Sequence, residues 1–255
     1  MSLDIELRRV SKTFGSGKTV VRELSVSVAA GGTLCIIGTS GCGKTTTLKS
    51  INRLIEPTEG EILIGGKDVL HRDAIGLRRS IGYVIQEGGL FPHMTVGANV
   101  GLVARLLDWD KPRMAKRVDE LLELVNLSPA EYRHRFPEEL SGGQRQRVGV
   151  ARALMADPPI VLMDEPFGAL DPITRIGLQN EFLRLKRELG KTIVFVTHDL
   201  PEAFKLGDRI ALMHQGELMQ VGTPHELLTR PANSFVSAFL QAHTIHDPRE
   251  AVRES

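Results

Sequence analysis

The stretch TLCIIGTSGCGKTTTLKS at residues 33–50 decides the fold of this 255-residue chain. It opens with the apolar run TLCII, which is typical of a buried strand, and it leads into a segment with Leu48, Ile51 and Leu54 at helical spacing. Between the two, GTSGCGKT at 38–45 matches the full G-x-x-x-x-G-K-[ST] pattern of a phosphate-binding loop. Glycines let a backbone wrap around phosphates, and the helix start supplies free N–H groups. The sequence therefore predicts a strand, a phosphate loop and a helix.

A second stretch, GSGKT at residues 15–19, ends in the same letters but fails the pattern. The required first glycine falls on Lys12, and the following VVRELSVSV alternates like a strand rather than a helix. We predict that residues 15–19 form a hairpin turn and that only the loop at 38–45 binds phosphate.

The composition is that of an ordinary globular protein, with 42% hydrophobic and 25% charged residues. The 32 basic and 31 acidic residues nearly cancel, which argues against a general nucleic-acid or membrane-surface binder. The only cysteines, Cys35 and Cys42, are too few for a disulfide framework and indicate a reducing, cytosolic setting. No run approaches the roughly 18–20 apolar residues that span a bilayer, so a partner would have to supply any membrane part.

Periodicity predicts an α/β organisation. The first third is rich in β-branched residues, 113–127 has helical spacing, and 141–155 forms a second helix with Ser141 as N-cap. The apolar runs 160–163 and 192–196 are typical of buried parallel strands. Residues of roughly 88–150 are then an insertion between strands of one sheet.

Three further segments are assigned by their patterns. Residues 174–189 form a helix with the apolar stripe Ile176, Phe182, Leu185 and Leu189. RIALMHQGELMQVG is predicted to be a hairpin, and TPHE has the pattern of a capping box at a helix start. The tail after residue 240 has little apolar content, so we expect it to be mobile.

Polar residues end several of these strands, where a nucleotide site needs them. Thr45 and Asp164 are candidate Mg²⁺ ligands, and Glu165 is a candidate general base. His198 is a candidate γ-phosphate contact, and Gln86 could touch both metal and water. The alternatives are solvated acids at a strand end and a structural histidine.

The stretch LSGGQRQR at 140–147 predicts a second anion-binding helix start, with Ser141 followed by two glycines. One ATP has no obvious need for two such sites in one chain. This end either meets the nucleotide of another subunit or is a capped helix with a solvated arginine face.

Together and in this order, GTSGCGKT, the Gln86 loop, LSGGQ, LMDEP with GALD, and VTHD resemble the ATPase subunit of an ABC transporter. The resemblance covers residues of about 3–240 and implies a P-loop NTPase (RecA-like) α/β core with an antiparallel β-subdomain and an inserted α-helical subdomain. The implied bounds are 1–240 for the ABC ATPase domain, about 1–87 and 156–240 for the core with the β-subdomain, about 88–155 for the helical subdomain, and 241–255 for a mobile tail.

The resemblance also implies roles for particular residues, with ATP and Mg²⁺ as cofactors. Glu165, His198, Lys44 and Gln86 act in catalysis, while Thr45, Gln86 and Asp164 hold the metal. A second copy binds head to tail and sandwiches ATP between the two chains. The residues implied to contact nucleotide are Phe14, Gly38, Thr39, Ser40, Gly41, Cys42, Gly43, Lys44, Thr45, Thr46, Ser141, Gly142, Gly143, Gln144 and Asp171. Phe14 would stack on adenine, with a plain core role as the alternative.

Within the family, long stretches such as INRLIEPTEG at 51–60 and DEPFGALDPITR at 164–175 are similar to importers of glycine betaine, choline or carnitine. This implies transmembrane permease subunits, an extracytoplasmic substrate-binding protein and a place on the inner face of the cell membrane. The loop at 87–96 would receive a permease helix, with a buried crossover as the alternative. Many such ATPases carry regulatory modules after this domain, and we expect none within these 255 residues.

Three other functions stay open. They are an ATPase of another small-solute or lipid transporter, a soluble ABC ATPase acting on nucleic acid or ribosomes, and a nucleotide-binding module without turnover. Lys44 beside Cys42 and the start of the helix also predict a reactive Cys42 thiolate, whereas Cys35 in the apolar strand should be inert.

Overall fold

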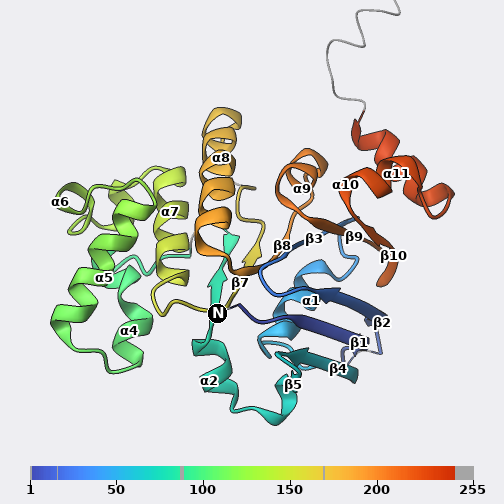
Figure 1. The fold of residues 1–255 in the computed structure, drawn as a ribbon, viewed down its shortest axis with the longest axis horizontal. Coiled ribbons are helices and arrows are strands. Elements are labelled where there is room, and N and C mark those ends of the chain that lie inside the picture. The colour runs from blue at the N-terminus through green and yellow to red at the C-terminus, as the bar shows by residue number, and fades with distance from the viewer. Residues whose placement is uncertain (1, 16, 87–88, 169, 245–255) are drawn as a thin grey trace, which may run out of the picture.

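The computed structural model describes residues 2–15, 17–86, 89–168 and 170–244, which form two sheets flanked by helices (Figure 1). The larger core sheet has the strand order β10-β9-β3-β8-β7-β6. Its strands pair in parallel, except for the antiparallel β9–β10 hairpin. The bounds are β3 Thr33–Gly38, β6 Ile81–Val84, β7 Ile160–Asp164, β8 Thr192–Val196, β9 Arg209–His214 and β10 Glu217–Gly222.

The core sheet separates two apolar cores, because alternate side chains of a strand point to opposite faces. Leu34 and Ile36 pack with α1 (Lys44–Ile51), whereas Cys35 and Ile37 pack with α8 (Pro172–Leu189) and α9 (Leu200–Leu206). Burial on both faces explains why the central strands are continuous apolar runs rather than alternating ones.

The second sheet is antiparallel, with the order β2-β1-β4-β5. Its strands are β1 Ile5–Thr13, β2 Thr19–Val28, β4 Glu59–Ile64 and β5 Lys67–Asp68. Thr13 pairs with Thr19, and the Phe14 backbone N–H donates to the Lys18 carbonyl at 3.1 Å. The predicted hairpin at residues 15–19 is therefore confirmed, although residue 16 lies outside the described residues.

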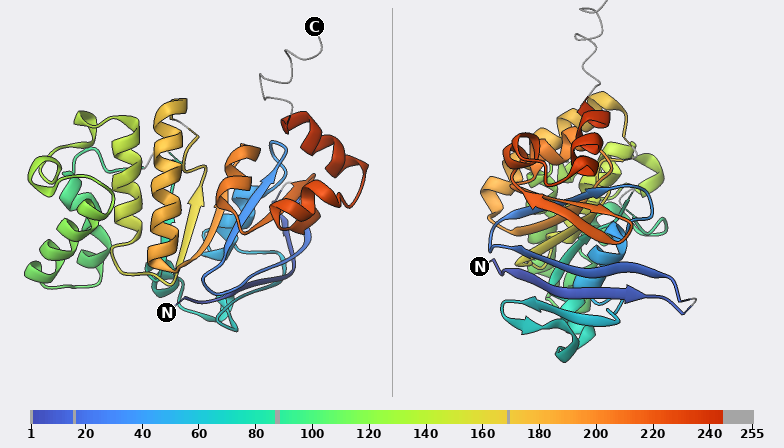
Figure 2. Two further views of the ribbon diagram at one scale, coloured as in Figure 1. Left: turned by 45° about the horizontal axis from the view of Figure 1, so that its top comes forward. Right: turned by 90° about the vertical axis from the view of Figure 1, so that its right-hand side faces the viewer.

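The segment between β6 and β7 is helical and lies at one end of the molecule, away from α11 (Figure 2). It contains α3 Val96–Val100, α4 Leu102–Leu106, α5 Lys111–Leu124, α6 Pro129–Tyr132 and α7 Gly142–Ala153. The remaining helices are α2 Ala74–Arg79, α10 Pro224–Thr229 and α11 Ser234–Thr244, with short 3₁₀ turns at Val69–His71 and Pro137–Glu139. No helix among the described residues is long and apolar enough to cross a bilayer.

Two details of the predicted helices are wrong. Helix α1 ends at Ile51, so Leu54 falls beyond it and is 50% exposed. Ile176 is 57% exposed, and Leu178 takes its place in the buried stripe of α8. Leu178 and Phe182 are four residues apart, which is one turn plus about 40°, so they lie on the same face of the helix. Ile176 is six residues before Phe182 and lies on a different face. Helix α11 continues past residue 240 to Thr244, and 245–255 of the predicted tail lie outside the described residues.

Candidate nucleotide site

The site lies at the carboxyl ends of four neighbouring parallel strands. The glycine loop follows β3, the acidic pair ends β7, His198 follows β8, and Gln86 follows β6. Ligands of open α/β sheets bind in the crevice at this edge. The topology therefore gathers residues that are up to 160 positions apart in the chain, as in the Gly38 and His198 pair.

Residues 38–45 form a close-fitting loop rather than an ordinary turn. Gly38, Gly41 and Gly43 have φ values of 145°, 74° and 101°, which side chains rarely adopt. A Cβ added to Gly43 would lie 2.6 Å from the carbonyl oxygen of Val20. The glycines of the motif are thus required by backbone conformation and by the close approach of β2, before any ligand is considered.

Lys44 is held across this loop. Its Nζ donates to the carbonyl oxygens of Gly38 at 2.9 Å and Thr39 at 3.1 Å, and the residue is only 8% exposed. A buried ammonium needs such partners to offset desolvation. The loop therefore keeps one positive charge at the start of α1, where the N–H groups of the first turn also favour an anion.

The predicted metal ligands come together in part. The Thr45 hydroxyl donates to Asp164 Oδ1 at 2.9 Å, although the two residues lie on different elements. Hydroxyl and carboxylate oxygens fit the preference of Mg²⁺ for oxygen donors. Gln86 is exposed two residues beyond the end of β6.

Glu165 and His198 form the second polar pair of the site. His198 Nδ1 lies 3.4 Å from Glu165 Oε2, and the side chains are 64% and 26% exposed. Glu165 adopts φ 46°, and its backbone N–H donates to the Val196 carbonyl at 3.0 Å. This left-handed turn directly after β7 aims the Glu165 carboxylate toward the end of β8, so a carboxylate and an imidazole can act on one molecule.

The predicted partner-facing residues lie apart from the phosphate loop. Ser141 caps α7 in a reciprocal capping box with Gln144, whose Nε2 donates to the Tyr132 hydroxyl at 3.0 Å. Helix α7 lies among the helices at one end of the molecule, while α1 lies against the core sheet (Figures 1 and 2). Gly142 and Gly143 open the same helix, so this end is preformed within a single chain.

Asp171 and Phe14 occupy exposed positions. Asp171 caps α8 by accepting from the Thr174 backbone N–H at 3.0 Å, and hydrogen bonds from Thr174 lower the pKa of its carboxyl. Phe14 is 40% exposed in the β1–β2 turn, with Lys12 Nζ 5.2 Å from its ring centroid. The alternative that Phe14 is a plain core residue is therefore wrong.

The structure corrects the prediction for Cys42. Its side chain is 2% exposed and packs in the apolar core beside α1 rather than toward the mouth of the loop. Burial raises the pKa of the Cys42 thiol and outweighs the opposing effects of Lys44 and nearby backbone N–H groups. Cys35 is fully buried in β3, and burial raises the pKa of its thiol strongly, which agrees with the predicted inertness.

Two residues at this edge of the sheet were not predicted from the sequence. Tyr83 lies on β6 beside Asp164, and burial together with the charge of that carboxylate raises the pKa of its phenol. His214, the last residue of β9, lies 3.3 Å from the Thr39 hydroxyl. The only signal for either one is that it lies near the end of a strand beside the motif-bearing strands.

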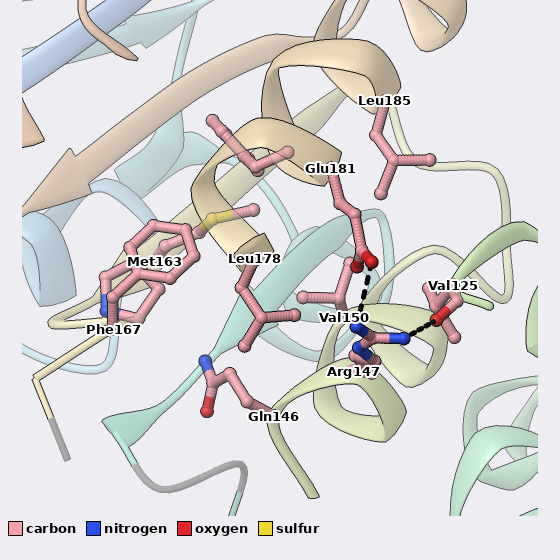
Figure 3. A pocket seen from close by; sticks show the side chains of 11 residues that line it. Val125, Gln146, Arg147, Val150, Met163, Phe167, Leu178, Glu181 and Leu185 are labelled. Atoms are coloured by element: carbon pink, nitrogen blue, oxygen red, sulfur yellow. Dashed lines mark hydrogen bonds and ion pairs between the residues drawn. The ribbon is translucent and has the colours of Figure 1, made fainter. Parts of the chain in front are cut away.

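A separate cavity lies between α7 and α8 (Figure 3). Its lining is mainly apolar, as with Met163, Phe167 and Leu178, and its volume of ≈ 30 Å³ has room for only a few waters. Arg147 crosses its rim and binds Glu181 at 2.8 Å. This cavity is too small and too apolar for a nucleotide and lies where the helical segment joins the core.

Comparisons with known proteins agree with this geometry. Residues 21–168 match the family model described as ABC transporter. The chain is 57% identical to the glycine betaine/carnitine/choline transport ATP-binding protein of Bacillus subtilis, over 92% of this chain and 62% of that protein. It is 52% identical to the glycine betaine uptake system ATP-binding protein of Escherichia coli, over 92% and 76%. The chain thus spans about three fifths of the length of the first curated relatives it matches.

Solved structures show the same fold. A dimeric ATP-binding cassette in a post-hydrolysis state, bound to ADP and Pi, matches with a TM-score of 0.77 and 35% identity, over 86% of this chain and 98% of that one. With the parallel sheet order and the glycine loop, this match confirms the predicted P-loop NTPase architecture.

Proposed function

Since the chain belongs to the ABC transporter ATP-binding family, we propose that it is the ATP-hydrolysing subunit of an importer for an osmoprotectant such as glycine betaine, choline or carnitine. One observation carries the activity: the phosphate loop, the Thr45–Asp164 contact and the Glu165–His198 pair share one edge of the core sheet. The names of the relatives above support the substrate class: the Bacillus subtilis protein is a glycine betaine/carnitine/choline transport ATP-binding protein, and the Escherichia coli protein is the ATP-binding protein of a glycine betaine uptake system.

The loop residues at 38–46 bind the phosphates of ATP in this proposal. Lys44 exchanges its two carbonyl partners for the β- and γ-phosphates, and the backbone N–H groups at the start of α1 bind the same anion. Thr45, Asp164 and Gln86 hold Mg²⁺, which neutralises phosphate charge when bound.

Glu165 and His198 carry out hydrolysis in this proposal. Glu165 accepts a proton from the attacking water as general base, and His198 senses the γ-phosphate. The 3.4 Å contact between their side chains supports a shared task, because each can orient the other.

A second copy of the chain completes the site. Ser141, Gly142, Gly143 and Gln144 contact the nucleotide of the partner, Asp171 contacts the partner chain, and Phe14 stacks on adenine. The exposed, capped start of α7 supports this arrangement because it offers N–H groups that the single chain does not bring to its own loop.

The permease subunits dock beside β6, in a hollow of ≈ 290 Å³ lined by residues that include Tyr83, Ile85, Phe91 and Leu102. Phe91 is 43% exposed, so the buried-crossover alternative is wrong for this residue, while 87–88 of the same loop lie outside the described residues. An extracytoplasmic binding protein delivers the substrate, and the ATPase works on the inner face of the membrane.

Comparing two lysine variants tests the activity. Lys44→Ala should abolish phosphate release, since no other cation replaces the ammonium at the phosphates. Lys18→Ala, in the exposed β1–β2 turn, should retain turnover near the wild-type rate. Loss in Lys18→Ala alone would contradict the site. Uptake of labelled betaine, choline and carnitine by the reconstituted transporter tests the substrate, and transport of none of them would favour another solute or lipid.

A further inference from the structure

His214 joins the phosphate loop to strand β9. Met213 pairs with Gly38 at the start of the loop, and a Cβ on Gly38 would lie 2.0 Å from the Met213 carbonyl oxygen. The next side chain, His214, has its Nδ1 3.3 Å from the Thr39 hydroxyl, at the long end of hydrogen-bonding distance. The end of β9 therefore contacts the loop through both backbone and side chain.

Thr39 connects His214 to the rest of the phosphate loop. Its carbonyl oxygen accepts from Lys44 Nζ at 3.1 Å and from the Cys42 backbone N–H at 3.3 Å. A shift of Thr39 therefore displaces the ammonium and the turn of the loop together. A residue that holds the His214 ring in place therefore also affects the positions of Thr39 and Lys44 in the phosphate loop.

Helix α11 fixes that ring through a stack of aromatic side chains. His214 stacks on Phe235, with ring centroids 4.0 Å apart and planes inclined by 28°. Phe235 lies 6.0 Å from Phe239, which stacks on His243 at 4.3 Å. Positions 235, 239 and 243 are four residues apart and hence lie on one face of α11. We call His214 and these three residues the ring stack.

Helix α11 is anchored by residues outside the ring stack as well as by Phe235 and Phe239, which pack against the same core. Val236 and Leu240 are 0% and 4% exposed and belong to the same apolar core as α9 and α10. The helix lies beyond the β9–β10 edge of the core sheet, at the opposite end from α7 (Figure 1). Covering that edge requires apolar area but does not require a hydrogen bond to Thr39.

We propose that His214 is a positioning residue of the phosphate loop and that Phe235 holds its ring in place, so that helix α11 sets how tightly the loop binds nucleotide. This inference rests on the proposed function, because it concerns ATP at the same loop. It assigns a role in nucleotide affinity to a helix that carries none of the motif residues.

Nucleotide affinity and thiol reactivity test the proposal on the purified chain. The variants are His214→Ala, Phe235→Leu, which keeps apolar volume but removes the ring, and Phe235→Tyr, which keeps the ring. Gln241→Ala, on the exposed side of α11, is the matched control. The dissociation constant of ATP in Mg²⁺ is measured by titration, and the rate of Cys42 labelling is measured without nucleotide, with peptide mapping to exclude Cys35.

His214→Ala and Phe235→Leu should weaken ATP binding by about three- to tenfold, the effect of one neutral hydrogen bond. They should also speed Cys42 labelling, while Phe235→Tyr and Gln241→Ala stay within twofold of wild type in both measurements. If ATP affinity and the labelling rate stay at wild-type values in His214→Ala and Phe235→Leu, the proposal is wrong. If these two variants also melt at a lower temperature, the ring stack serves only to cover the edge of the sheet. Wild-type protein that binds no ATP would overturn the proposed function, whereas the labelling rates report on the ring stack without nucleotide.

Discussion

Glu202 is expected to make this protein less stable as the pH rises. The residue is 3% exposed at the start of α9, and its Oε1 has no hydrogen-bond partner within the described residues. Burial, reinforced by the charge of Asp199, raises the pKa of its carboxyl from 4.5 to about 8. Hydrogen bonds from Thr197 and Gln179 and the charge of Arg175 oppose this increase without cancelling it.

The size and sign of the effect follow from linkage. The folded state binds the Glu202 proton more tightly than the unfolded state, so folding is penalised once the unfolded chain ionises. The penalty is absent below about pH 4, grows through the interval between the two pKa values, and levels off above about pH 8. The difference between the two values corresponds to about 5 kcal/mol, of which we expect about 3 to 5 kcal/mol to be measurable.

Glu202→Gln removes the ionisation while keeping the shape of the side chain. Urea unfolding at pH 4 and pH 8.5 should show nearly equal stability at pH 4 and a more stable variant at pH 8.5. Glu226→Gln is the control of opposite sign, because hydrogen bonds from Thr223 lower the pKa of Glu226 and its contribution is lost on acidification. Parallel pH profiles for wild type and Glu202→Gln would show that the buried carboxyl stays charged and that the reasoning is wrong.

Three further outcomes are expected. Glu165→Gln should bind Mg-ATP, hydrolyse it very slowly and double in mass by light scattering. Adding Ser141→Arg should abolish that doubling. A Glu165→Gln protein that stays monomeric with ATP at high protein concentration would count against the cross-chain site. Phe91→Asp should weaken assembly with the permease in pull-down while sparing basal phosphate release, and equal loss of both would argue for a folding role. Cys42 should react with maleimide more slowly than a free thiol, because it is buried, so rapid labelling would contradict the packing seen here.

Local sequence was sufficient where backbone chemistry dictates structure. The turn across Gln215 and Gly216 was predictable because glycine takes positive φ readily, and both residues have positive φ, as in a type I′ hairpin turn. The N-cap at Ser141 and the capping box at Thr223 were likewise predicted from polar residues at helix starts, and the structure adds a capping box at Ser141. For the site, strand ends carrying Asp164, Glu165 and His198 could be predicted to converge, because parallel strands share one carboxyl edge.

What sequence could not supply was the direction of side chains in three dimensions. Cys42 sits beside Lys44 in the chain, which predicted a thiolate, yet its side chain points into the core, and burial outweighs the neighbouring charge. The contact of His214 with Thr39 joins residues 175 positions apart and has no motif. This contact depends on how β9 packs beside β3, which is a property of the whole sheet.

Phosphate binding depends both on the residues of the loop at 38–45 and on residues distant from it in the sequence. The glycines of the loop provide a backbone conformation that would be strained for other residues, and the carbonyls of Gly38 and Thr39 accept hydrogen bonds from the Lys44 ammonium. The residues that carry those carbonyls both contact β9: Gly38 pairs with Met213, and the Thr39 hydroxyl lies 3.3 Å from His214 Nδ1. A motif of eight residues therefore specifies which atoms meet the phosphates, while the strand beside it and the helix α11 that packs on that strand specify where those atoms are. Variation in ATP affinity among chains with the same loop sequence should accordingly depend on residues outside the motif.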